Sequence, residues 1–185
     1  MTHLRLPVAV LTAALAAAPA HAEVKKFMNR CNAGLCAYYR LVLTPPDGWV
    51  VDKQATEKRN VQIMVPKGTN FANAPLLIYV QVFYHDKKQT LADFASVSNG
   101  RWKAHVEDAK ISELPAVARA NGKPGYLRFS FENPSKSRQP YELGAFGVDT
   151  DEDGNEFVLD VVMTGGDKAA LDRADGAYIA FLKAN

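Results

Sequence analysis

The segment Leu76–Tyr84, with the sequence LLIYVQVFY, is the most strand-like run in the chain, and the prediction of the fold starts from it. Successive side chains point to opposite faces of a strand. One face of this strand carries Ile78, Val80, Val82 and Tyr84, and the other carries Leu77, Tyr79 and Phe83. Because both faces are apolar, we predict a central strand that other elements cover on both sides.

Similar alternation on either side of this segment predicts more strands. They cover residues 37–43, 61–65, 110–120, 127–131, 141–150 and 156–163. The turn residues Pro45–Gly48 end the first of them, and Asp153-Gly154 is a hairpin signal between the last two. Pro115 marks an edge strand or a bulge. Residues 23–30 are polar and basic and fit an edge strand or a short helix, and residues 54–60 fit a polar connector.

Two helices complete the predicted order of elements. Thr90 can cap a helix that runs to about Ala104. Asp167 can cap a last helix, in which apolar residues recur at helical spacing: Leu171, Ala174, Tyr178 and Phe181. Short turns join most neighbouring strands. The order therefore predicts an α+β fold over residues 23–185, a single layered domain with a central, mostly antiparallel sheet flanked by helices.

Length and composition limit the classes of protein to which this chain can belong. The 185 residues suit one compact domain, and 48% hydrophobic with 23% charged residues are values of a globular protein. The formal net charge is +2. A nucleic-acid-binding domain has a strongly basic face, so this balance argues against nucleic acid as a partner.

Residues 1–22 have the pattern of a secretory signal peptide. Arg5 gives a positive start, Leu6–Ala18 is apolar, and Ala20-His21-Ala22 matches a cleavage site. A membrane-spanning helix needs about 20 apolar residues, which is more than this run provides. We therefore expect cleavage near Ala22, a periplasmic or secreted protein, and no membrane span after cleavage.

The two cysteines, Cys31 and Cys36, lie five positions apart around Asn32 and Gly34, which favour a tight reversal. In an oxidising compartment this arrangement predicts a structural disulfide. A redox-active pair typically has two intervening residues, and this pair has four. A zinc site that adds His85 and His105 is an alternative with weak ligand spacing.

The motif Asp149-x-Asp151-x-Asp153-Gly154 matches the first half of a calcium-binding loop, with Asp160 at the twelfth position. Alternate carboxylates can converge there on a hard cation. Against this, Glu156 replaces the usual apolar residue and the flanks look like strands. The competing interpretation is a solvated acidic hairpin tip that binds no cation. The sequence suggests no cofactor other than calcium.

The sequence singles out no catalytic residue. His85 stands beside Asp86 and could act as a base with an orienting carboxylate, and His105 stands at a predicted helix end. Common motifs of serine hydrolases, nucleotide-binding proteins and zinc proteases do not occur. A hydrolase with an unrecognised site stays open as an alternative, and it needs a pocket that holds one of these histidines near a carboxylate.

Several short segments resemble the PsbP-like superfamily, which includes DcrB-like bacterial envelope proteins. They are Pro46-Asp47-Gly48-Trp49, Val61–Pro66 with Lys67-Gly68, Ile78-Tyr79-Val80, Thr90-Leu91-Ala92-Asp93-Phe94, and the final paired strands with a helix from Asp167. The resemblance covers residues 38–184 as an order of elements. It implies an antiparallel sheet flanked by helices and a role in binding or assembly. No site residue is carried over, because no functional motif of the family matches.

These observations predict an exported periplasmic protein of non-enzymatic binding or assembly type, whose partner is an envelope or periplasmic protein. Such a protein should expose an apolar or aromatic patch. The two alternatives are a calcium-responsive binding module that uses the acidic hairpin 149–160, and a hydrolase with an unrecognised site.

Overall fold

The structure, a computed structural model, describes residues 23–32, 34–85, 88–106, 108–120, 122–133 and 139–185. The predicted signal peptide lies outside the described residues. The main element is a seven-stranded sheet in which every neighbouring pair of strands is antiparallel. Across the sheet the order is β3 (Trp49–Val51), β4 (Gln62–Pro66), β5 (Leu76–Tyr84), β9 (Glu156–Gly165), β8 (Tyr141–Thr150), β7 (Tyr126–Glu132) and β6 (Lys110–Val117). The predicted α+β fold with a central antiparallel sheet is confirmed.

The segment Leu76–Tyr84 is an inner strand, as predicted. It pairs with β9 over its full length, from Leu76 opposite Gly165 to Tyr84 opposite Phe157. On its other side it pairs with β4, but only over its first half. Pro115 lies in β6 at the outer edge, where the register shifts between Leu114 and Val117, so the predicted edge irregularity is confirmed.

Three helices accompany the sheet: α1 (Lys53–Arg59), α2 (Leu91–His105) and α3 (Lys168–Ala184). The last two match the predicted helices and their caps, Thr90 and Asp167. The prediction of a polar connector over residues 54–60 is wrong. The Asp52 side chain accepts a hydrogen bond from the Ala55 main-chain N–H at 3.0 Å, and Ala55 and Thr56 are buried, so a cap and one apolar face form a short helix.

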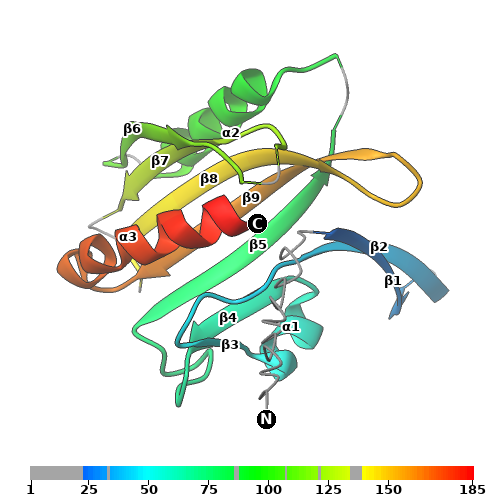
Figure 1. Ribbon diagram of the computed structural model, residues 1–185, viewed down its shortest axis with the longest axis horizontal. Helices are drawn as coiled ribbons and strands as arrows, with labels where there is room; N and C mark the ends of the chain where they lie inside the picture. The colour runs from blue at the N-terminus through cyan, green and yellow to red at the C-terminus, as the bar shows by residue number, and fades with distance from the viewer. Residues whose placement is uncertain (1–22, 33, 86–87, 107, 121, 134–138) are drawn as a thin grey trace, which may run out of the picture.

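The first two strands form a separate sheet. They are β1 (Glu23–Cys31) and β2 (Gly34–Val42), which pair along their whole length as a hairpin. We call this hairpin, residues 23–42, the arm. Figure 1 shows that the arm extends outward beyond β5 and away from the helices.

Each face of the main sheet has its own cover. Figure 1 shows α3 lying across β8 and β9, and the buried side chains of α3 pack on that face. The base of the arm joins the same core through Val24 and Leu41, followed by Leu43. On the opposite face, Ala55 of α1 packs on Ile63 of β4, and Ala95 of α2 packs on Phe146 of β8. The predicted two-sided covering of the sheet is therefore confirmed.

Two carboxyl side chains lie on the sheet face that carries α1 and α2. Asp160 of β9 stands opposite Phe146 of β8, and Glu142 lies further along β8. Burial raises the pKa of Glu142 to about 7. Burial, with a smaller contribution from the charge of Glu142, raises the pKa of Asp160 to about 7. The folded protein therefore binds more protons than the unfolded chain between about pH 4 and pH 7.

From this proton uptake we predict that the contribution of these two groups to the free energy of unfolding falls as the pH rises from about 4 to about 7. Above about pH 7 this contribution is constant. Replacing Asp160→Asn removes an ionised, half-buried carboxylate. It should raise the free energy of unfolding by about 1–2 kcal/mol at about pH 8 and change it little at about pH 4. Urea unfolding of the variant at both pH values measures this. The exposed Asp153→Asn serves as a control, and a loss of stability of Asp160→Asn at the higher pH would contradict the assignment.

Candidate functional site

A groove lies between the arm and the end of β5. It has a volume of about 490 Å³. The chain lines it from four places: Ala37, Tyr38 and Tyr39 of β2; Val80–Tyr84 of β5; Asn60 and Val61 before β4; and Asn155 and Phe157 at the start of β9. The groove lies where β2 passes the end of β5 without pairing with it.

Aromatic rings form part of the groove wall. The Tyr39 and Phe157 rings are 4.8 Å apart between centroids, and the Tyr84 ring meets Phe157 edge to face at 6.0 Å. Phe157 is buried, whereas 73% of Tyr84 is exposed. The exposed ring of Tyr84 therefore rests against a buried aromatic and leaves most of its surface available for a contact.

Exposed apolar side chains gather at this end of the molecule. Among the described residues, six large hydrophobic side chains are exposed, and four of them belong to the arm or to the end of β5: Met28 (54%), Leu35 (65%), Phe83 (40%) and Tyr84 (73%). Val50 and Val97 lie elsewhere. Solitary exposed apolar side chains are ordinary on a surface, but a group of them beside a groove is typical of an interaction site.

The register of the arm explains why its apolar residues lie together. Met28 stands opposite Ala37, and Leu35 is two residues further along β2. Because the period of a strand is two, these residues share one face of the arm with Val24 and Leu41. That face is buried at the base of the arm, and further out it exposes Met28 and Leu35 beside the charged Lys26 and Arg30.

The arm is basic, and the neighbouring hairpin tip is acidic. Residues 23–42 contain four basic side chains and one acidic side chain, Glu23, which pairs with Lys25 at 2.9 Å. At the β8–β9 tip, hydrogen bonds from Asn155 and the nearby charge of Lys26 hold the pKa of Asp151 below its usual value. The arm therefore presents positive charge close to the groove.

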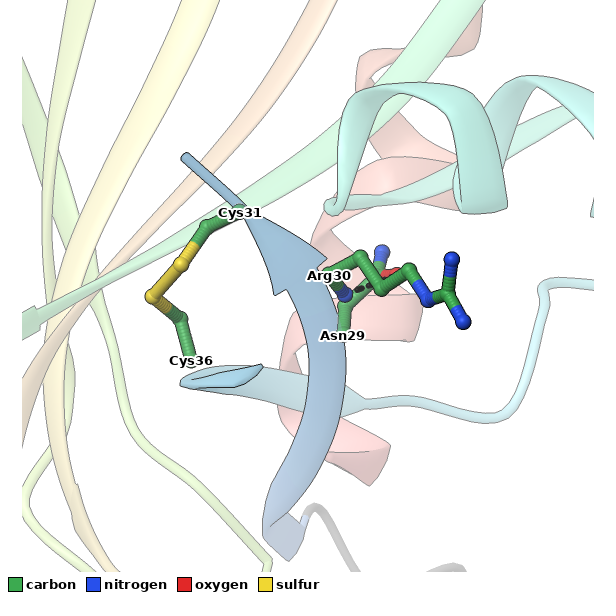
Figure 2. Close-up of a disulfide and its surroundings, with 4 residues drawn as sticks. All are labelled: Asn29, Arg30, Cys31 and Cys36. Atoms are coloured by element: carbon green, nitrogen blue, oxygen red, sulfur yellow. Dashed lines mark hydrogen bonds between the residues drawn. A yellow bond between two sulfur atoms is a disulfide. The ribbon is translucent and has the colours of Figure 1, made fainter. Parts of the chain in front are cut away.

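A disulfide closes the outer end of the arm. Cys31 and Cys36 are at disulfide distance, with Cα atoms 5.9 Å apart, as predicted. Figure 2 shows the bond bridging the ends of the two strands where they turn. Gly34, at the turn, has a φ of +110°, which a residue with a side chain rarely adopts. Cysteines held in this bond do not supply thiolates, so the alternative of a zinc site loses its sulfur ligands.

The four carboxylates of the predicted calcium site are not brought together. Asp149 is buried and forms ion pairs with Arg119 at 2.9 Å and Lys123 at 2.6 Å. Asp160 stands in the middle of β9 opposite Gln81 and Phe146. In the described part of the chain, no three histidine, cysteine or acidic side chains are grouped as metal ligands. Calcium binding stays a prediction, and the placement of these two residues argues against it.

The rest of the acidic motif forms a hairpin turn. The Asp151 carboxylate accepts hydrogen bonds from the main-chain N–H groups of Asp153 at 3.0 Å and Asn155 at 2.8 Å. Gly154 has a φ of +79°. Asp153 is exposed. These contacts fit the solvated acidic hairpin tip, with Asp151 folding the turn.

The two histidines that the structure describes, His85 and His105, do not line the groove. His85 is buried, with Nδ1 on the Glu156 carboxylate and Nε2 2.7 Å from the main-chain oxygen of Gln89. Its sequence neighbour Asp86 lies outside the described residues. The exposed His105 has Nδ1 2.8 Å from the main-chain oxygen of Arg101. The sequence does not predict Glu156 as the partner of His85, because only the pairing of β5 with β9 brings the two residues together.

Comparison with known proteins gives no match to a family model and no match to a curated protein. The resemblance to the PsbP-like superfamily therefore stays a prediction. Within the described residues, no helix combines the length and the apolar composition that a membrane crossing requires.

The ion pairs of Asp149 give a stability prediction. Replacing Asp149→Asn leaves the buried Arg119 guanidinium without its carboxylate, and we expect the free energy of unfolding to fall by about 3 kcal/mol or more. Asp153→Asn at the exposed tip should change it by less than about 0.5 kcal/mol. Urea unfolding of both variants distinguishes the roles, and equal effects would contradict them. Millimolar calcium should leave the melting temperature of the wild-type protein unchanged.

Proposed function

We propose that this chain is an exported, non-enzymatic binding protein that holds a partner protein of the periplasm or envelope in the groove between the arm and β5. The observation that carries the proposal is that the exposed Phe83 and Tyr84 line this groove, while the arm on its other side exposes Met28 and Leu35. Exposing such side chains risks aggregation, so a surface that keeps them together beside a cavity suits a specific contact.

The construction of the arm supports the same role. A two-stranded hairpin that projects into water has little core of its own and is marginally stable alone. The disulfide ties its outer end and the buried residues Val24 and Leu41 anchor its base. The apolar surface between these two fixed points is therefore held in one shape before a partner arrives, which reduces the cost of binding.

The disulfide agrees with an oxidising compartment, and therefore with the proposed export. The resemblance to the PsbP-like superfamily, whose members have binding or assembly roles, agrees with a protein that acts through contacts. The two histidines weigh against the hydrolase alternative: His85 has both ring nitrogens in contact with neighbouring groups, and neither histidine lines the groove.

The test of the proposal is photo-crosslinking inside cells that export the protein. A photoreactive amino acid placed at Tyr84 should give a reproducible crosslinked protein, and one placed at the exposed Val97 should not give that product. Adding Leu35→Ser should lower the yield at Tyr84 by about tenfold, because the most exposed apolar side chain of the arm is lost. Val50→Ser, an equivalent change away from the groove, is the matched control. Equal yields from both positions, or no effect of Leu35→Ser, would contradict the proposal.

A further inference from the structure

The edge of β5 beside the groove lacks a strand partner in the described part of the chain. β4 pairs with β5 only from Met64 opposite Ile78 to Gln62 opposite Val80. β5 continues to Tyr84 and keeps β9 on its other side throughout. Gln81–Tyr84 therefore has a strand on one side only.

The turn before β4 explains why this edge is left open. Asn60 ends α1 with a φ of +60°, in the left-handed region, and the chain enters β4 only at Gln62. The segment that could have continued β4 along β5 is thus used for a helix and its cap. β2 approaches β5 from across the groove, but it belongs to the separate sheet of the arm and does not pair with β5.

The other edges of the main sheet are protected. β6 carries Pro115 and an irregular register, and charged Lys110 and Glu113 stand on it. β3 has only three residues. Short strands, charges, proline and bulges are the usual means of preventing edge pairing. The sequence of Gln81–Tyr84 contains none of these features, and this is the edge that the groove exposes.

The side chains of this edge define what would fit along it. Val82 and Tyr84 point to the sheet face of Phe157 and the arm, and Gln81 and Phe83 point to the face of α2. A strand added here would place alternate side chains beside Val82 and Tyr84, in contact with the aromatic wall. Those alternate positions must be apolar to match it.

The charge of the arm sets a second requirement. Lys26 and Arg30 are exposed and lie on the face of the arm that also carries Met28. An occupant with lysine or arginine next to the arm would be repelled, and one with aspartate or glutamate would be attracted. The complementary chemistry is apolar at alternate positions and acidic beside the arm.

Resting on the proposed function, we infer that the groove binds an extended segment of its partner by strand addition to the free edge of β5 at Gln81–Tyr84. The segment carries apolar side chains at alternate positions along the edge and acidic side chains at its ends, beside the arm. Main-chain hydrogen bonds to the edge supply part of the affinity, and the aromatic wall and the basic arm supply the selectivity.

The test uses a synthetic peptide of eight residues with blocked ends, in which two glutamates stand at each end of a central segment of four alternating valine and threonine residues. Added at millimolar concentration to the full mature protein, it should slow amide hydrogen exchange within Gln81–Tyr84, as followed by NMR. The same peptide with alternate main-chain nitrogens methylated should bind at least about tenfold more weakly, because the donors for the edge are gone. A peptide with lysine in place of glutamate should also bind more weakly.

Three results would overturn strand addition. The first is that the peptide leaves amide exchange at Gln81–Tyr84 unchanged. The second is that the methylated peptide binds with the same affinity as the unmethylated one. The third is that, without peptide, exchange at this edge slows as the protein concentration rises. The last would mean that a second copy of this chain occupies the edge. If the crosslinking at Tyr84 still depends on Leu35, the proposed function survives each of these results, so the two proposals fail separately.

Discussion

The pairing of β5 with β9 is the interaction on which the rest of the structure depends. It runs without a break from Leu76 opposite Gly165 to Tyr84 opposite Phe157 and lies inside the sheet. Both faces of β5 are apolar, so α1 and α2 are held on one side and the arm on the other. The same pairing carries Tyr84 and Phe157 to the end of the sheet, where the groove begins.

A difference in strand length turns this structural pairing into a candidate binding surface. β9 is long enough to pair with all of β5, but β4 leaves its last four residues uncovered. The arm then passes this open edge without closing it, and its disulfide fixes the end that no core supports. The face of the arm that is buried at its base also carries Ala37 and Tyr39, which line the groove. The alternation of side chains along the arm therefore contributes both to the stability of its base and to the proposed binding surface.

The sequence predicts the parts of this arrangement that depend on local patterns. The apolar run of β5, the Asp153-Gly154 turn, the caps Thr90 and Asp167 and the cysteine pair are all signals within a few residues, and all are found. Helix α1 was missed because it is short and polar, and its cap Asp52 acts with burial of Ala55 on a strand that follows later. Local signals also suggested a calcium loop, but the Asp149 carboxylate forms an ion pair with Arg119, which lies thirty residues away in the chain.

The candidate site could not be predicted from the sequence, because it depends on where β4 stops along β5 and on the path of the arm. Both are long-range registers that no local pattern sets. Most residues that line the groove are ordinary strand residues in the sequence, and what marks the site is the exposure of Phe83 and Tyr84 beside a cavity.

The most direct test of the groove as the binding surface is NMR mapping of the isotope-labelled mature protein with its purified crosslinked partner. The account predicts that the largest chemical-shift changes fall on residues 37–39 and 81–84, and on Asn155 and Phe157, which line the groove. Changes that cluster on α3 or on β6, with the groove residues unaffected, would contradict it.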